Sequence, residues 1–311
     1  DVPNVTAASA LVADLESGLA LYEKAATEAR PPASTAKIMT ALVVIDQVPL
    51  DDVVVVSPTA ASTPGSRMGL NAGDRLTVLE LLYGLLLPSG NDAAVALAQH
   101  VAGTQADFVE LMNARASAMG LSSTRFANAH GLDAAGQVTS ATDLVTLART
   151  ALQDPNIAEI VAVRSITIGG HQLENTNELL GTYDGANGVK TGTTDEAGEC
   201  LVASVTRDGR TTLLVELGST DRFGDARKLL DYAAEAFVWH NTDLPASALA
   251  WVTGHDDRYY RLRSESTSDI FVPAWQQALL LPVVRLDAGA VMTGTAPIGE
   301  LWWVLGSERV A

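Results

Sequence analysis

Residues 201–218 read LVASVTRDGRTTLLVELG, and this stretch decides the fold. Residues 201–206 and 212–218 are rich in β-branched and apolar side chains, and Asp208-Gly209 lies between them. Asp-Gly between two such runs is the strongest short-range signal of a β-hairpin, because the turn needs residues that tolerate a positive φ. The stretch therefore predicts two adjacent antiparallel strands.

Three more strands are predicted upstream of this hairpin. Residues 8–13 alternate small and apolar side chains, residues 16–18 (Glu-Ser-Gly) are a turn signal, and residues 19–22 are apolar again, which indicates a second hairpin. Asn187-Gly188 predicts a turn that leads into a short strand ending at Thr193. Together these strands predict an antiparallel sheet of five strands, which is a typical sheet size.

Helices are predicted for the middle of the chain. After Pro31-Pro32, apolar side chains recur at intervals of three and four residues, which predicts a helix over residues 34–48. Further helices are predicted at residues 77–86, 92–102, 104–119, 141–151 and 221–238. We expect the last helix to return and pack on the sheet, so the predicted fold class is α+β.

The length of 311 residues suits one large domain or two. The pattern changes at His240, after which Asn241, Asp243, Pro245 and Ser247 predict a linker. Residues 248–311 are strand-like throughout. We therefore predict a first domain over residues 1–240 and a small all-β domain over residues 241–311.

The charge balance argues against several classes of partner. The chain has 20 basic and 37 acidic residues, which gives a formal net charge of −17. Phosphate contacts need a basic face, so no nucleic-acid partner is expected, and docking on an anionic membrane is disfavoured as well. No apolar run approaches the roughly 20 residues of a membrane helix. The chain starts at Asp1, which indicates a removed targeting segment or a trimmed chain.

Cysteine and histidine usage argues against a metal site. The single cysteine, Cys200, excludes an internal disulfide and a cysteine zinc cluster. It lies among small and apolar residues and is expected to be a buried small hydrophobe. The histidines show no ligand spacing, so neither a metal nor a cofactor is expected; they are His100, His130, His171, His240 and His255.

Lysine is rare in this chain, with four residues against 16 arginines. A lysine here is therefore expected to do what arginine cannot do, such as lose its proton. In Ser34-Thr35-Ala36-Lys37, the serine and the lysine lie three residues apart at a predicted helix start, with Cβ atoms about 5–6 Å apart. A buried lysine with a lowered pKa could take the serine proton and make Ser34 a nucleophile. The ordinary alternative is a helix N-cap beside a solvated lysine.

Two other segments carry candidate polar groups. Lys190-Thr191-Gly192 lies on a predicted strand, where the lysine and the hydroxyl could hold a carboxylate and Gly192 could admit a ligand backbone. The alternative is a solvated lysine on an edge strand. Ser89-Gly90-Asn91 lies between two predicted helices, where a plain turn and helix cap is the alternative.

S-x-x-K, S-x-N and K-T-G in this order are the motif set of penicillin-binding proteins and serine β-lactamases. Over about residues 8–238 the chain resembles the D-alanyl-D-alanine carboxypeptidases, which are low-molecular-mass penicillin-binding proteins. The segments that carry the resemblance are residues 31–40, 65–68, 89–98, 126–128, 131–132, 188–194, 197–198 and 201–204. The resemblance implies helices on both faces of the five-stranded sheet. The region after residue 238 resembles the family's C-terminal domain only in its size and its β-rich sequence pattern.

The resemblance also implies a mechanism on a peptide ending in D-Ala-D-Ala. Ser34 attacks the carbonyl between the two alanines, and Lys37 accepts the serine proton. Ser89 passes a proton to the departing D-alanine, and Asn91 holds the substrate amide and orients Lys37. Water then hydrolyses the acyl-enzyme.

Substrate binding is implied for a second set of residues. The backbone N–H groups of Ser34 and Thr193 form the oxyanion hole, while Lys190 and Thr191 bind the terminal carboxylate. Gly192 and Thr193 also belong to the implied substrate-binding set. Arg222 matches a family arginine that supports this carboxylate site. The resemblance further implies covalent inhibition by β-lactams, an extracytoplasmic location, and membrane attachment only through a segment absent from this chain.

Three alternatives remain open. A serine β-lactamase shares the motifs, but class A enzymes carry an E-x-x-L-N segment that is missing between Asn91 and Lys190. A DD-transpeptidase would use an amine in place of water, and the residues do not exclude it. A non-catalytic β-lactam or peptidoglycan sensor belongs to a different class, and the intact serine and both lysines disfavour it.

Overall fold

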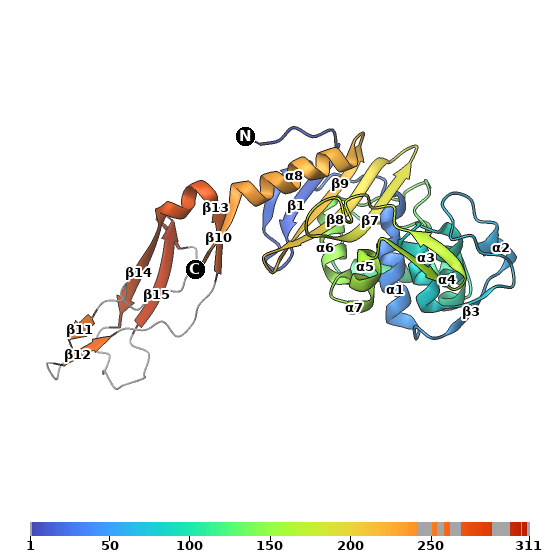
Figure 1. Ribbon diagram of the computed structural model, residues 1–311, viewed down its shortest axis with the longest axis horizontal. Coiled ribbons are helices and arrows are strands. Elements are labelled where there is room, and N and C mark those ends of the chain that lie inside the picture. The colour runs from blue at the N-terminus through green and yellow to red at the C-terminus, as the bar shows by residue number, and fades with distance from the viewer. Residues whose placement is uncertain are drawn as a thin grey trace. The chain divides into compact units, whose positions relative to one another are not determined.

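The computed structural model describes residues 2–241, 251–253, 258–261, 269–287, 299–305 and 307–309. The chain forms two compact units, Asp1–Asp231 and Tyr232–Ala311. The first unit is built on a five-stranded antiparallel sheet in the order β2-β1-β9-β8-β7 (Figure 1). Its strands are β1 (Ser9–Asp14), β2 (Ala20–Lys24), β7 (Ala186–Thr194), β8 (Gly198–Arg207) and β9 (Arg210–Ser219).

Both predicted hairpins are confirmed. β8 and β9 are joined by Asp208 and Gly209, which have φ angles of 51° and 77°, as a two-residue hairpin turn requires. β1 pairs with β2 and also with β9, so the N-terminal hairpin extends the sheet. β7 lies at the opposite edge of the sheet, and it carries the Lys190-Thr191-Gly192 motif.

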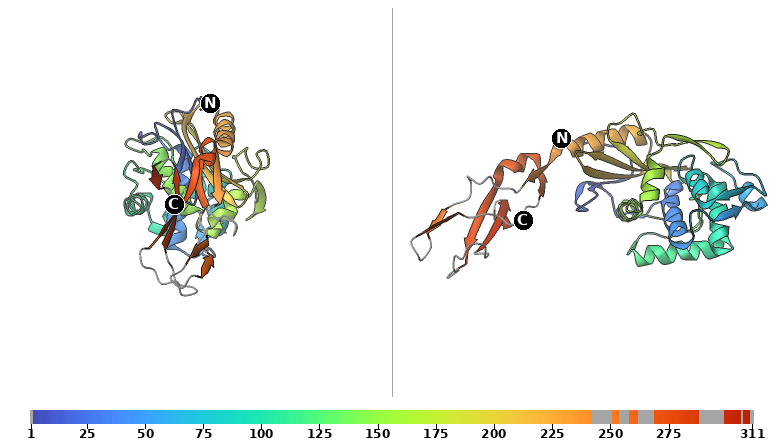
Figure 2. Two further views of the ribbon diagram at one scale, coloured as in Figure 1. Left: turned by 90° about the vertical axis from the view of Figure 1, so that its left-hand side faces the viewer. Right: turned by 60° about the horizontal axis from the view of Figure 1, so that its bottom comes forward.

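Helices cover both faces of this sheet (Figure 2), so the predicted fold class is confirmed. On one side α1 (Lys37–Gln47) packs against four other helices and is buried over most of its length, as expected of a helix that is apolar almost all round. These helices are α3 (Val78–Leu86), α4 (Asn91–Ala102), α5 (Gln105–Ala118) and α6 (Ala141–Ala151). On the other side α8 (Arg222–Ala236) buries Ala226, Leu229 and Leu230.

Several short elements complete the first unit and were not predicted. Two are helices, α2 (Pro58–Ala61) and α7 (Pro155–Ala162), which are too short to show a clear period in the sequence. The others are two-stranded ribbons, β3 (Val53–Val55) with β4 (Arg75–Thr77) and β5 (Ser165–Ile168) with β6 (His171–Glu174). The predicted helix over 34–48 begins as the 3-10 turn η1 (Ala33–Ala36) and becomes α-helical only at Lys37.

The predicted turn at Asn187-Gly188 is wrong. Both residues lie inside β7, at an irregularity in its pairing with β8. The Asn187 side chain is satisfied across the sheet, because it donates to Thr206 Oγ1 and accepts from Ser204 Oγ. A Cβ at Gly188 would lie 2.9 Å from Val161 Cγ2. Close packing against α7 therefore accounts for this glycine.

The second unit holds a separate all-β region, as predicted. β10 (Phe237–Asn241) pairs with β13 (Asp269–Pro273), and β14 (Leu280–Leu286) pairs with β15 (Gly299–Leu305). The remaining elements are β11 (Trp251–Thr253), β12 (Tyr259–Arg261), η2 (Ala274–Leu279) and β16 (Glu308–Arg309). A small core forms from Ile270, Val272, Leu280 and Trp303.

The predicted linker does not begin at His240 and Asn241. Both residues belong to β10, where they pair with Ile270 and Asp269 of β13. Asp243, Pro245 and Ser247 lie outside the described residues. Within the described part of the chain, every helix is too short or too polar to span a bilayer.

Candidate active site

Ser34 and Lys37 meet at a serine turn, defined here as residues 33–37, where η1 passes into α1. Lys37 Nζ donates a hydrogen bond to Ser34 Oγ at 2.9 Å. Ser34 is partly exposed, whereas Lys37 is fully buried. The structure therefore brings the two residues together as their spacing predicts, and it excludes the solvated-lysine alternative.

Lys37 is enclosed by three acceptors. Besides Ser34 Oγ, its ammonium donates to Asn91 Oδ1 at 2.7 Å and to the His130 carbonyl at 2.5 Å. Three acceptors match the three donors of an ammonium group. Burial lowers the pKa of Lys37 well below its ordinary value, and the charge of Lys190 lowers it further. The amine can therefore accept a proton from the serine that it contacts.

Asn91 is held by the loop over residues 64–70. Its side-chain Nδ2 donates to the Pro64 carbonyl at 2.7 Å, so its Oδ1 is directed to Lys37. Asp92 is fully buried and accepts from the backbone N–H groups of three loop residues, Met68, Gly69 and Leu70. Gly65 has a φ of +89°, and a Cβ there would lie 2.5 Å from Asn91 Nδ2. The loop therefore fixes which end of the Asn91 amide faces the lysine.

Ser89 lies between α3 and α4 in a left-handed conformation with a φ of 64°. The residue is 5% exposed. Its hydroxyl makes no hydrogen bond to any described residue. A buried hydroxyl without a partner is free to turn toward a substrate group, in keeping with the predicted proton transfer.

The carbonyl of His130 is a functional group that sequence reasoning missed. It accepts from Lys37 Nζ and also from Ser34 Oγ at 3.4 Å. Gly131, with a φ of +90°, makes this approach possible, because a Cβ there would collide with the Ala33 carbonyl. Burial and then the charge of Lys37 lower the pKa of the His130 imidazole to about 4, so the ring is neutral at pH 7. A backbone carbonyl leaves no signal in residue type.

The second part of the site is the edge segment, defined here as residues 190–193 of β7. Lys190 is 1% exposed, and its Nζ donates to the Thr191 carbonyl at 2.9 Å. Burial and then the charge of Arg222 lower the pKa of Lys190 to about 7. Lys190 is therefore not the solvated edge-strand lysine of the alternative interpretation.

Gly192 sets the contact between the edge segment and the serine turn. A Cβ at Gly192 would lie 2.7 Å from the Ser34 backbone nitrogen and 2.9 Å from Ala33 Cβ. The space beside this glycine is therefore filled by the protein's own serine turn, whereas the sequence suggested room for a ligand backbone. Thr193 follows on the strand and is exposed, beside its ladder partner Glu199.

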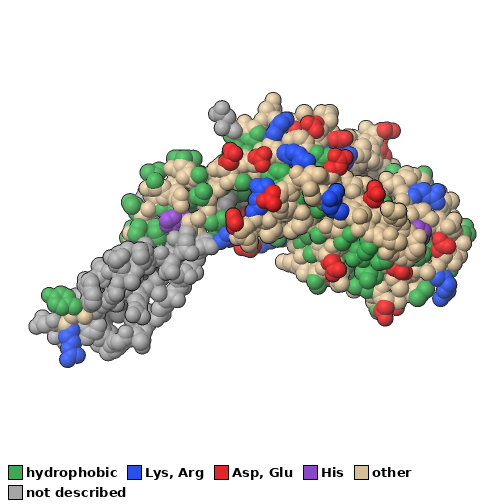
Figure 3. Space-filling model, viewed as in Figure 1, with side chains coloured by type: hydrophobic (Ala, Val, Ile, Leu, Met, Phe, Trp, Pro, Cys, Tyr) green, Lys and Arg blue, Asp and Glu red, His purple; other side chains and the backbone are tan. Residues whose placement is uncertain are grey.

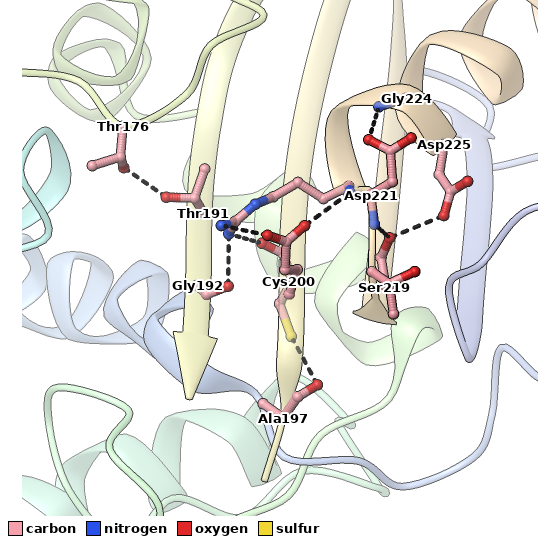
Figure 4. Close-up of polar contacts among 12 residues, drawn as sticks. Thr176, Thr191, Gly192, Ala197, Cys200, Ser219, Asp221, Gly224 and Asp225 are labelled. Carbon is pink, nitrogen blue, oxygen red and sulfur yellow. Dashed lines mark hydrogen bonds and ion pairs between the residues drawn. The ribbon is translucent and has the colours of Figure 1, made fainter. Parts of the chain in front are cut away.

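Arg222 supports the edge segment through its backbone. Its Nη1 donates to the Gly192 carbonyl at 2.8 Å and to the Cys200 carbonyl at 3.3 Å (Figure 4). Its Nη2 lies 3.5 Å from Glu199 Oε1, and its backbone N–H donates to Glu199 Oε2. The guanidinium thus ties the ends of β7 and β8 together. Glu199, which the sequence did not single out, holds the arginine in place.

Cys200 is a buried residue of β8, as expected. It is a free thiol with no exposed surface, and burial raises its pKa to about 11. A protonated, inaccessible thiol is unreactive. Among the described residues no cluster of three or more His, Cys, Asp or Glu side chains is placed to hold a metal ion.

The electrostatics of the site differ from those of the surface. On the face drawn in Figure 3, acidic and basic side chains of the first unit are interspersed. The formal net charge of the chain is −17. The basic side chains inside the site are Lys37, Lys190 and Arg222, all largely buried. An anionic ligand would therefore be received by cations held inside the site.

Comparisons with known proteins agree on one family. The peptidase S11 family model, described as D-alanyl-D-alanine carboxypeptidase, matches residues 1–221. D-alanyl-D-alanine carboxypeptidase DacF of Bacillus subtilis is 36% identical over 247 residues, which cover 75% of this chain and 64% of that protein. DacC of Escherichia coli is 39% identical over 253 residues, with coverages of 76% and 63%. The match thus spans less than two thirds of these relatives.

Solved structures with the same fold include penicillin binding protein 6B of Escherichia coli, at 32% identity and a TM-score of 0.82, covering 100% of this chain and 95% of that one. The D-alanyl-D-alanine carboxypeptidase DacD of Francisella tularensis has 26% identity and a TM-score of 0.80, with coverages of 100% and 92%. The Streptomyces K15 DD-transpeptidase has 35% identity and a TM-score of 0.71, with coverages of 75% and 98%.

Proposed function

The chain belongs to the peptidase S11 family of D-alanyl-D-alanine carboxypeptidases, and from this premise we propose that it removes the terminal D-alanine from peptidoglycan stem peptides. The single observation that carries the proposal is the contact of 2.9 Å between Lys37 Nζ and Ser34 Oγ, made by a lysine with no exposed surface. A serine activated by a neighbouring base is the arrangement that acyl transfer needs.

The first step forms an ester on Ser34. Its Oγ attacks the carbonyl carbon between the two D-alanines, and its proton passes to Lys37. The tetrahedral oxyanion is stabilised by the backbone N–H groups of Ser34 and Thr193, each worth about 3–4 kcal/mol in comparable sites. The contact of Gly192 with the serine turn supports this pairing of donors, since it keeps the edge segment beside Ser34.

The second step expels D-alanine. Ser89 passes to the leaving amine the proton that Lys37 took from Ser34, so both side chains regain their starting protonation. The Ser89 hydroxyl, which has no hydrogen-bond partner among the described residues, supports that role. Asn91 binds the substrate amide while its Oδ1 orients Lys37. Water then hydrolyses the ester and releases the shortened peptide.

The terminal carboxylate of the substrate lies against the edge segment. Lys190 supplies the charge and Thr191 a hydroxyl. Arg222 holds the strand through the Gly192 carbonyl, in addition to contributing positive charge nearby. We infer that β-lactams, which carry a carboxylate beside a strained amide, acylate Ser34 and remain bound. The missing E-x-x-L-N segment removes the class A route to deacylation.

We also infer a division of labour along the chain. The catalytic domain lies within residues 1–240, because every candidate catalytic and substrate-binding residue lies there. The described residues of 241–311 belong to the β-rich second unit, and we infer that this region supplies no catalytic group. Because stem peptides lie outside the cytoplasm, the protein acts in the cell envelope.

The test is incubation with a peptide ending in D-Ala-D-Ala and measurement of released D-alanine, with Ser34→Ala as the control. We expect release by the wild-type chain and none by the variant. Adding an amine acceptor distinguishes a carboxypeptidase from a transpeptidase, because a transpeptidase would join the acceptor to the peptide and yield a longer product detectable by mass. Covalent labelling by penicillin without any D-alanine release would instead indicate a sensor.

A further inference from the structure

Thr176 links two parts of the site that lie far apart in the sequence. It follows β6, and its Oγ1 lies 2.6 Å from Thr191 Oγ1 on the edge segment (Figure 4). Its backbone N–H donates to the carbonyl of Leu87 at 3.2 Å, two residues before Ser89. Thr176 therefore connects the start of the Ser89-Gly90-Asn91 loop with the hydroxyl proposed to bind the substrate carboxylate.

The segment around Thr176 has no regular secondary structure, but side-chain hydrogen bonds hold it to neighbouring elements. Asn175 Nδ2 donates to the carbonyls of Val161 and Val163. Asn177 is 2% exposed, and its Nδ2 donates to the Gly188 carbonyl in β7 at 2.8 Å. Side-chain bonds thus fix the backbone on both sides of Thr176, so its hydroxyl is held at a defined distance from Thr191.

The direction of the bond between the two hydroxyl groups decides what Thr191 can offer a ligand. Each hydroxyl has one proton to donate. If Thr191 donates to Thr176, it presents only lone pairs to the site, and lone pairs repel a carboxylate. If Thr176 donates to Thr191, the proton of Thr191 is free for the ligand. The competing acceptor for Thr176, the Leu87 carbonyl, is at 3.4 Å, much farther than the 2.6 Å to Thr191.

We propose that Thr176 is a positioning residue, which donates its hydroxyl proton to Thr191 and so turns the Thr191 proton toward the terminal carboxylate of the substrate. This inference rests on the proposed function, because it needs a substrate with a C-terminal carboxylate. It concerns a residue outside the three motifs, and it makes a prediction specific to that carboxylate. An acceptor-only ligand needs donors, and Lys190, with a pKa of about 7, is partly uncharged at neutral pH.

The test compares two versions of one peptide, ending in D-Ala-D-Ala carboxylate or in its carboxamide. Thr176→Val keeps the shape and removes the hydroxyl, and Thr176→Ser restores a hydroxyl. We expect Thr176→Val to raise KM for the carboxylate peptide about three- to tenfold, the range for one lost hydrogen bond, with little change in kcat. The carboxamide should be affected less than about twofold, and Thr176→Ser should resemble the wild type on both.

A matched control is available in Thr211→Val. Thr211 Oγ1 lies 2.7 Å from Thr206 Oγ1, in a similar hydroxyl pair at the β8–β9 hairpin. This variant should lose comparable thermal stability with an unchanged KM for both peptides. An equal rise in KM for the two peptides, or a wild-type KM for Thr176→Val, would overturn the role of Thr176 and leave the proposed function standing. A wild-type chain that neither releases D-alanine nor is acylated by penicillin would overturn the proposed function and this role with it.

Discussion

Lys37 and Lys190 are both buried, at 0% and 1% exposure, yet their surroundings differ. In the serine turn, Lys37 meets three acceptors, one of which is the Ser34 hydroxyl. In the edge segment, Lys190 makes one hydrogen bond among the described residues, to the Thr191 carbonyl. Its ammonium therefore keeps donors for a ligand. The difference shows how one residue type can serve as a base, at Lys37, and as a binding group for a ligand, at Lys190.

The largest effect should come from removing the Ser34 hydroxyl, which Lys37 is proposed to deprotonate. We expect Ser34→Ala to abolish both D-alanine release and covalent labelling by penicillin, since Lys37 donates a hydrogen bond to no other hydroxyl among the described residues. Ser89→Ala should still be labelled, but more slowly, because the nucleophile remains. Intact-mass measurement over time distinguishes the two variants. Labelling of the Ser34→Ala chain would contradict the different roles assigned to Lys37 and Lys190, because it would show that Ser34 is not the nucleophile that Lys37 activates.

The next effect should come from forcing the two regions apart. Gly192→Ala places a Cβ 2.7 Å from the Ser34 backbone nitrogen, so the serine turn or the edge segment must shift. We expect acylation to slow by about 100-fold, as misplacement of reacting groups by about 1 Å can do. Gly120→Ala is the control, because a Cβ there meets nothing within 4 Å. It should lose stability through its φ of +73° and keep its acylation rate. Equal rates for the two variants would show that the contact is unnecessary.

The comparison also predicts a pH dependence. The pKa of Lys190 is about 7, so its positive charge is present at pH 6 and largely lost at pH 8. Binding of a carboxylate should weaken as pH rises through this range, and KM should increase by up to about tenfold.

Lys190→Arg sharpens this prediction. Arginine stays charged in proteins, so the KM of the Lys190→Arg variant for the carboxylate peptide should not change between pH 6 and pH 8. A steady-state series with the carboxylate peptide over that range makes the measurement. A flat KM for the wild-type chain would mean that Lys190 does not receive the carboxylate as a titrating cation.

The smallest effect is expected from the C-terminal region. A chain that ends at Ala236, the last residue of α8, keeps both lysines and every residue of the proposed site. Its kcat/KM on a soluble peptide should equal that of the full chain, with circular dichroism and size-exclusion chromatography as checks of folding. Lost turnover in a folded, monodisperse truncation would show that the second unit contributes to the site.

Sequence patterns predicted those parts of the fold that depend on local signals. The hairpin at Asp208-Gly209 follows from two residues that adopt a positive φ, and the helices from a regular apolar period. Asn187-Gly188 carries the same kind of turn signal, yet it lies within β7. Its glycine is required by close packing against Val161, which belongs to a different element. Such packing depends on the tertiary fold and leaves no local pattern.

The same limit applies to the site. The spacing of Ser34 and Lys37 predicts their contact, since residues three apart at a helix start lie on one face. Lys190 and Asn91 were identified by the order of the motifs. The His130 carbonyl and the Thr176 hydroxyl were missed, because every residue has a carbonyl and threonine is common. Their importance comes from the folded chain, which places them 2.5 Å from Lys37 Nζ and 2.6 Å from Thr191 Oγ1, respectively.

The measurement that tests the central claim most directly is the rate of acylation by a chromogenic β-lactam in Lys37→Arg and Lys190→Arg, side by side. Arginine keeps the charge but cannot give up its proton. Lys37→Arg should therefore acylate about 10²–10⁴-fold more slowly than the wild type, close to Lys37→Ala, as expected for a lost general base. Lys190→Arg should retain most of the rate. A Lys37→Arg chain that acylates within a few-fold of the wild type would contradict the assignment of Lys37 as the base and of the two lysines to different tasks.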